Sequence, residues 1–265
     1  MNYRRRLVAM INGFLSHFDL RISRKSHFPR DWRNHFAHMR TLGFECRTIF
    51  DVGVATQTED LYDAYPGAEI VLVEPLEEYK PALAKIVDKY SAHLELAAAG
   101  ENVGSVVINV PRALGASTVY NTPEMAITDF EPRTVPMTTL DTIWASNEFE
   151  GPVLIKLDVQ GAELDVLKGS VNLLQSTEVL IVETNLFESF EGSPLFIDHV
   201  NYMYNKGFVV YDIIGGGYSH SSRRLGFVDL VYVRKDSSYH QDKSYYTKDD
   251  LHKFVIATDG IKRKP

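Results

Sequence analysis

Residues 153–163 read VLIKLDVQGAE, an apolar strand that ends in acidic and polar residues and then breaks at a glycine. Such a run is typical of a buried parallel strand. Three other runs end in the same way: IFDVGV at 49–54, VLVEP at 71–75 and LIVET at 180–184. Open α/β sheets bind ligands at the carboxyl ends of their strands. The four runs therefore predict one site along one edge of one sheet.

The composition is that of an ordinary soluble globular protein. The chain has 265 residues, of which 45% are hydrophobic and 24% charged, and its net charge is −7. Its apolar runs are too short to span a bilayer, and the N-terminus lacks the pattern of a secretory signal. The single cysteine, Cys46, excludes an internal disulfide and is interpreted as a core residue. These features predict a cytoplasmic protein.

The N-terminal region differs in charge from the rest of the chain. Residues 3–33 hold eight lysines and arginines against two acids. Apolar residues at helical spacing predict an amphipathic helix over residues 4–18. Two interpretations are open: peripheral contact with the inner face of an anionic membrane, or a helix packed on the domain. The acidic remainder of the chain argues against a general nucleic-acid partner. The oligomeric state is not predicted.

From Cys46 onward, strands and helices alternate, which predicts a parallel sheet with helices on both faces. The fold class is therefore α/β, a Rossmann-like, doubly wound, mostly parallel sheet with a C-terminal antiparallel hairpin. Three segments are expected: a helical extension at 1–45, one domain at 46–235 and a polar tail at 236–265. The expected strands are 47–53, 69–74, 93–98, 133–138, 153–158 and 178–184, with a β-rich stretch at 103–110 and a hairpin of 208–214 and 226–234 around Gly215–Gly217. The expected helices are 31–43, 58–65, 77–91, 139–147, 162–175 and 194–206.

The first two strand ends suit an adenosine-bearing ligand. Asp51 stands at the first strand end, and Gly53 allows a tight turn because glycine adopts positive φ without cost. Ala55 and Thr58 occupy positions where the dinucleotide fingerprint needs glycines, so a pyrophosphate is not expected. Glu74 ends the second strand, where doubly wound folds bind ribose hydroxyls.

Several stretches together resemble the FkbM-type family of S-adenosylmethionine-dependent methyltransferases. They are DVGVATQTEDLY (51–62), LVEPLEEY (72–79), TTLDTI (138–143), IKLDVQGAELDVLKGS (155–170), LIVETN (180–185) and FVDLVYVRK (227–235). The resemblance implies a class I methyltransferase fold with S-adenosylmethionine as cofactor. It also implies a set of cofactor-binding residues: Asp51, Gly53 and Val54 at the methionine end, Glu74 with Pro75 at the ribose, Ala98 and Ala99 near the adenine, and Asp158 beside the reacting methyl.

The acids and one histidine are candidates for the chemistry of methyl transfer. A base that takes a proton from a hydroxyl acceptor accelerates transfer, and the catalytic candidates are Asp158, Glu183 and His199. For Lys156, a structural ion pair and a catalytic role both remain open. Glu163 is equally compatible with a site role and with a simple preference for acids in the first turn of a helix. No compact metal-ligand motif is present, and no metal ligands are predicted.

The sequence predicts an O-methyltransferase that acts on a hydroxyl of a glycan or sugar, or of a small secondary metabolite. One alternative is a catalytically silent module that binds S-adenosylmethionine. It is favoured by Gln57 and Gln160, where family members often have glycine and glutamate. The other alternative is a nicotinamide-dependent oxidoreductase, against which the missing glycines at 55 and 58 argue.

Overall fold

The computed structural model describes residues 10–11, 30–56, 58–112, 114–241, 244, 247–248 and 251. Except for residues 10–11, the helix predicted over 4–18 lies outside the described residues, as do most of the polar tail and Gln57. In the described part of the chain, no helix is long and apolar enough to cross a membrane.

The centre of the molecule is a seven-stranded sheet with the order β3-β2-β1-β7-β8-β10-β9. The first five strands in this order pair in parallel, and β10 pairs antiparallel with both β8 and β9. The strands are β1 (Thr48–Val52), β2 (Glu69–Val73), β3 (His93–Glu95), β7 (Val153–Leu157), β8 (Thr177–Asn185), β9 (Phe208–Tyr218) and β10 (Leu225–Arg234). The predicted fold class, including the antiparallel hairpin, is confirmed.

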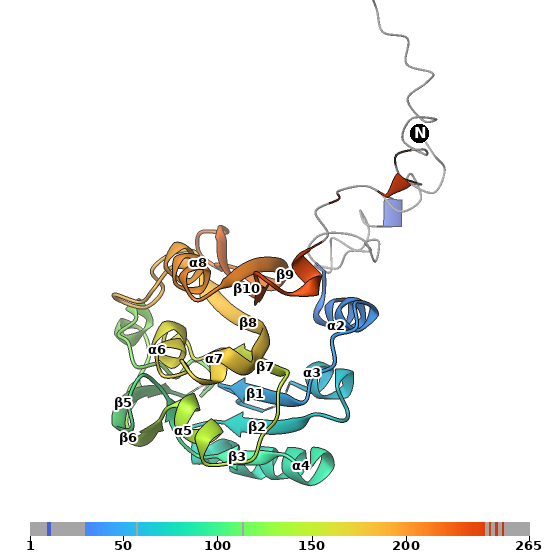
Figure 1. Ribbon diagram of the computed structural model, residues 1–265. Helices are drawn as coiled ribbons and strands as arrows, with labels where there is room; N and C mark the ends of the chain where they lie inside the picture. The colour runs from blue at the N-terminus through green and yellow to red at the C-terminus, as the bar shows by residue number, and fades with distance from the viewer. Residues whose placement is uncertain are drawn as a thin grey trace, which may run out of the picture.

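Helices cover both faces of this sheet (Figure 1). Alternate strand residues point to opposite faces, so Ile49 and Ile181 belong to one hydrophobic cluster, and Phe50 and Val182 belong to the other. The first cluster is covered by α2 (Trp32–Thr41), α3 (Glu59–Ala64) and α4 (Lys80–Tyr90). The second is covered by α5 (Leu140–Ala145), α6 (Glu163–Lys168), α7 (Leu173–Ser176) and α8 (Phe196–Asn205).

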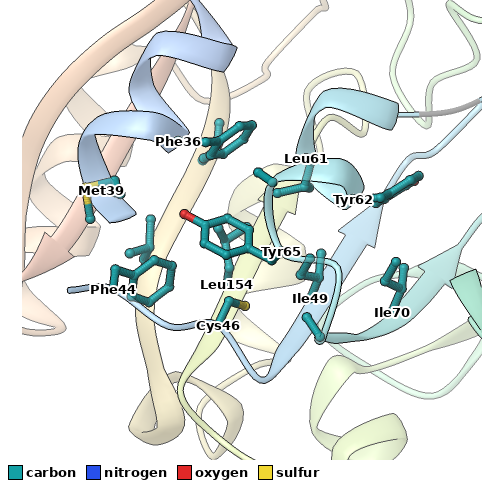
Figure 2. Packing of buried hydrophobic residues seen from close by; sticks show 14 of the residues in the cluster. Phe36, Met39, Phe44, Cys46, Ile49, Leu61, Tyr62, Tyr65, Ile70 and Leu154 are labelled. Atoms are coloured by element: carbon teal, nitrogen blue, oxygen red, sulfur yellow. The ribbon is translucent and has the colours of Figure 1, made fainter. Parts of the chain in front are cut away.

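The helix α2 packs into the main core. Asp31 caps it by accepting from the backbone N–H of Asn34, and the helix ends just before Gly43. Phe36 of α2 and Phe44 contact the ring of Tyr65 edge to face, with centroid distances of 5.8 and 5.5 Å. Figure 2 shows the rings of Phe36 and Tyr65 above Leu154 and Cys46, with the ring of Phe44 to the left of these two residues. Burial raises the pKa of Cys46 to about 12, in keeping with a core residue.

A second, smaller sheet stands beside the carboxyl ends of the large one. It has the order β4-β6-β5, formed by β4 (Ala98–Ala99), β5 (Gly104–Pro111) and β6 (Phe130–Thr138). The single strand predicted over 93–98 was wrong, because β3 pairs with β2 while β4 pairs with β6. The connection from β5 to β6 includes a short 3-10 helix (Pro123–Ala126), and Thr118 forms an isolated bridge with Asn109.

Two other predictions are corrected. The helix predicted over 162–175 is divided into α6 and α7 near Gly169, where a Cβ would lie 2.1 Å from the Gly100 carbonyl oxygen. Gly215–Gly217 are not a loop, because they lie in β9 opposite Asp229, Val228 and Phe227. A Cβ on Gly215 would lie 1.9 Å from Asp229 Oδ2, so these glycines make room for side chains of β10.

Candidate active site

The carboxyl ends of β1, β2 and β7 border a cavity of about 700 Å³, part of which is open to solvent. The small sheet and residues 114–119 complete its wall. Six of the residues predicted to bind the cofactor lie on this wall: Gly53, Glu74, Pro75, Ala98, Ala99 and Asp158. Asp51 and Val54 are buried and are not among the lining residues.

Gly53 is required by the close approach of two strand ends. Its φ is +74°, and a Cβ at this position would lie 1.8 Å from the carbonyl oxygen of Asp158. The Gly53 N–H donates to Val73 O at 3.0 Å, and the Asp158 N–H donates to Val52 O at 3.1 Å. The chain therefore turns at Gly53 between its two neighbours in the sheet, and only glycine fits there.

Glu74 presents a fixed carboxylate to the cavity. The residue is only 4% exposed. Its Oε1 accepts from the Leu76 N–H at 2.9 Å, and its Oε2 accepts from the Ala55 N–H at 3.0 Å. Burial raises the pKa of Glu74, and the two backbone donors oppose that rise. Each oxygen keeps a further lone pair that can accept from a ligand hydroxyl.

One end of the cavity is apolar. Leu76, Ala98 and Ile108 form a small buried cluster with Leu114 and Val119 packed against it, and all five line the cavity. This surface suits a flat aromatic group. Of these residues, sequence reasoning identified only Ala98. Leu76 follows β2, Ile108 belongs to the small sheet, and Leu114 and Val119 belong to an irregular segment, so their spacing carried no signal of a shared site.

The other end of the cavity is polar and is built by the segment that follows β7. Gln160 Nε2 donates to Asp158 Oδ1 at 2.8 Å, and the Thr118 hydroxyl donates to the Gln160 carbonyl at 2.7 Å. Glu163 Oε1 accepts from the N–H groups of Val159 and Gly161, at 3.0 and 3.2 Å. Glu163 therefore holds the segment in place. Burial raises the pKa of Glu163 to about 7.

Lys156 connects Asp51 to the cavity wall. Its Nζ lies 3.2 Å from Asp51 Oδ1 and 3.6 Å from Asp158 Oδ2, and it donates to Gly53 O at 2.9 Å. The other Asp51 oxygen accepts from the Tyr62 hydroxyl. Burial opposes the charge of Lys156, but Asp51 and Asp158 outweigh it, and the pKa of Lys156 is raised. The ion-pair interpretation of Lys156 is thus the one that the geometry favours.

Glu183 and Asp229 form a cross-strand carboxyl pair. They are direct partners on the antiparallel strands β8 and β10, so their side chains share one face of the sheet. Burial first, and then the charge of Asp158, raises the pKa of both groups. Trp32 Nε1 donates to Asp229 Oδ2 at 3.3 Å. Sequence reasoning missed Asp229, although its position in the apolar strand FVDLVYV sets it apart.

The third catalytic candidate, His199, lies away from these groups. It is 1% exposed on α8, and burial lowers its pKa to about 4. That helix packs against the cluster of Phe50 and Val182, which is on the opposite face from Glu183. His199 is not among the lining residues. Within the described residues, no group of three or more His, Cys, Asp or Glu side chains is arranged to hold a metal ion.

A family model described as "Methyltransferase FkbM domain" matches residues 51–210. No curated protein matches the chain. Among solved structures, the N-terminal domain of EvdMO1 with S-adenosylhomocysteine and D-fucose is 10% identical, covers 88% of this chain and 98% of its own, and has a TM-score of 0.44.

Two other solved structures are similar at the same level. Magnesium protoporphyrin IX methyltransferase from Synechocystis PCC 6803 is 13% identical, with 77% of each chain covered and a TM-score of 0.43. Fibrillarin from Aeropyrum pernix is 12% identical, with 70% of this chain and 66% of its own covered and a TM-score of 0.41. At these identities and TM-scores, the similarity supports no conclusion about a substrate.

Proposed function

Because the chain belongs to the FkbM methyltransferase family, with S-adenosylmethionine as its cofactor, we propose that it methylates a hydroxyl oxygen of a sugar or glycan, or of a small secondary metabolite. The observation that carries the proposal is a set of three carboxyl groups: Asp158, which lines the cavity at the end of β7, and the cross-strand pair of Glu183 and Asp229, which lies near enough for the charge of Asp158 to raise the pKa of both. The family membership leaves the nicotinamide-dependent alternative without support.

The residues of the cavity fit the cofactor. Gly53 lines the cavity with backbone alone, because the Asp158 carbonyl occupies the place of a Cβ, and this bare turn suits the methionine end. Glu74 offers its free lone pairs to the ribose hydroxyls, and the apolar end around Ala98 and Ile108 suits the adenine. When bound, the cofactor supplies an electrophilic methyl group on a positively charged sulfur. Asp158 lies on the polar part of the wall, where its charge favours that cation.

The carboxyl groups serve the acceptor. Transfer forms an oxygen–carbon bond and breaks a sulfur–carbon bond, and the acceptor hydroxyl loses its proton. An ionised Asp158 or a member of the Glu183–Asp229 pair takes this proton and passes it to solvent, a contribution of about 10²- to 10⁴-fold in rate. Lys156, which lies beside Asp158, is already paired with Asp51. Such a site disfavours phosphorylated or carboxylated acceptors and favours neutral, hydroxyl-rich ones.

The test uses S-adenosylmethionine with a tritiated methyl group and a set of neutral methyl glycosides, each compared with its sugar phosphate. We expect methylation of a neutral glycoside and none of its phosphate. The Asp158→Asn variant should lose about 10²-fold or more of the rate. Glu150→Gln, which changes an exposed acid paired with Arg47, is the control and should keep it. Tight binding of S-adenosylmethionine with no transfer to any hydroxyl would instead favour the catalytically silent module.

A further inference from the structure

Lys156 makes three polar contacts, and two of them are with groups other than its partner Asp51. It stands directly opposite Asp51 in the parallel pair of β7 and β1, and both side chains are buried. Lys156 forms an ion pair with one oxygen of Asp51, and the Tyr62 hydroxyl donates to the other. A buried ammonium has three N–H donors, each of which needs an acceptor. The other two contacts of Lys156 are with the Gly53 carbonyl oxygen and the Asp158 carboxylate.

These two additional contacts are both on the cavity wall. Gly53 and Asp158 line the cavity, and their backbones already meet so closely that a side chain on Gly53 would overlap the Asp158 carbonyl. Lys156 Nζ lies 2.9 Å from the first and 3.6 Å from the second. One buried cation thus fixes the orientation of the turn carbonyl and of the carboxylate. Because Asp51 balances the charge of Lys156, the charge of Asp158 is left for a ligand.

We propose that Lys156 is a positioning residue for S-adenosylmethionine, which holds the Gly53 turn and the Asp158 carboxylate in the arrangement that receives the sulfonium end of the cofactor. Asp51 acts as its permanent counterion and does not touch the cofactor. The proposal corrects the expectation that Asp51 lines the methionine end. It rests on the cofactor of the family, not on the identity of the acceptor.

The experiment measures binding of S-adenosylmethionine and S-adenosylhomocysteine by calorimetry to the full chain and its variants. Lys156→Met alone leaves Asp51 buried without a counterion, which endangers folding. The principal variant is therefore the double substitution Asp51→Asn with Lys156→Met, in which an asparagine oxygen can still accept from Tyr62. Loss of two charge-assisted contacts should weaken S-adenosylmethionine binding by about tenfold to a hundredfold.

The comparison of the two ligands separates positioning from general loss of structure. Their sulfur atoms differ in charge, so misplacement of Asp158 should weaken S-adenosylmethionine more than S-adenosylhomocysteine. A loosened fold would weaken both alike. Asp212→Asn is the matched control, since it breaks a half-buried ion pair with Arg30 that lies away from the cavity wall. It should change the melting temperature and leave both affinities unchanged.

A folded double variant that binds S-adenosylmethionine within about threefold of the wild type would overturn the proposal. If the double variant does not fold, Lys156→Arg provides the same comparison. Its guanidinium keeps a charge beside Asp51, but its planar donors cannot meet three groups around one nitrogen. Reduced affinity supports the proposal, and unchanged affinity contradicts it. A wild-type chain that binds the cofactor but methylates no hydroxyl acceptor would end the proposed function and leave this comparison intact.

Discussion

The two halves of the sheet edge satisfy their polar groups in different ways. At the ends of β1, β2 and β7, which we call the cofactor wall, Glu74 accepts from two backbone N–H groups and Asp51 is paired with Lys156. On β8 and β10, the carboxyl pair of Glu183 and Asp229 shares one face of the sheet, and no lysine, arginine or histidine of the described residues forms a salt bridge with it. Trp32 of α2 donates to Asp229.

This difference indicates what each half does. A set of satisfied groups holds one geometry, which suits a cofactor that is the same in every turnover. Like charges directly opposite each other on adjacent strands destabilise a sheet. Acids with strongly shifted pKa values often belong to functional sites. A carboxyl pair that remains on adjacent strands despite this cost is therefore a candidate for a catalytic role.

The largest effect is expected at the cofactor wall from Gly53→Ala. The added methyl group would collide with the Asp158 carbonyl, and the φ of +74° adds strain. We expect loss of cofactor binding by more than about a hundredfold, with strain of about 1–3 kcal/mol in the unfolding free energy. Gly43→Ala is the control, because Gly43 has a φ of +83° with open space around it. Calorimetry should find that Gly43→Ala binds the cofactor as tightly as the wild type. A similar loss of cofactor affinity in both variants would show that backbone strain, and not the collision with Asp158, is responsible.

Glu183→Gln tests the other half. The folded pKa of Glu183 is raised, so its protonated form stabilises the fold at low pH, and this stabilisation is lost as the pH rises through the folded pKa. The variant should therefore be more stable than the wild type at high pH. Its transfer rate should fall by about 10²-fold or more. Urea denaturation and methyl-transfer assays measure the two effects. A variant that is less stable at high pH and fully active would contradict the assignment of the pair to chemistry.

Glu163→Gln sharpens the comparison with a buried acid that belongs to the cofactor wall. Glutamine keeps an oxygen for the N–H groups of Val159 and Gly161, so cofactor affinity should change little. The folded pKa of about 7 is raised, so the wild type should lose stability between about pH 4.5 and pH 7. The loss is on the order of 3 kcal/mol. Denaturation measured at several pH values across this window should give an unfolding free energy that changes less with pH in the variant than in the wild type. The same pH dependence in both proteins would contradict the titration of Glu163.

The smallest effect on function is expected from His199→Gln. Burial depresses the pKa of His199 to about 4, so its contribution to stability is present above about pH 6.5 and is lost as the pH falls toward 4. As the pH falls through this window, the unfolding free energy of the variant should fall less than that of the wild type. Because α8 covers the face of the sheet away from Glu183, methyl transfer should stay within about twofold of the wild type. A loss of a hundredfold would restore the histidine as a catalytic candidate.

The sequence predicted the parts of the molecule that depend on local patterns. Apolar runs closed by acids indicated the parallel strands, and Gly53, Glu74 and Asp158 do lie on one cavity wall. It failed where a residue's environment is set by distant partners. Gly215–Gly217 were predicted as a loop because the sequence does not show that Phe227 and Asp229, on the next strand, fill the space beside these glycines.

The same limit applies to the site. Asp51 has the position of a ligand-binding acid in the sequence, but only the register with β7 reveals that Lys156 engages it. Asp229 became a candidate only through its pairing with Glu183 across the sheet. The apolar end of the cavity joins Ala98 to Ile108 and Leu114, which no sequence spacing relates.

The central claim is that the cofactor wall binds S-adenosylmethionine, and a crystal structure with S-adenosylhomocysteine tests it most directly. The account predicts ribose hydroxyls within hydrogen-bond distance of Glu74, the adenine against Ala98 and Ile108, and the sulfur beside Gly53 and Asp158. A ligand bound elsewhere, or one whose ribose leaves Glu74 with only its two backbone donors, would contradict it.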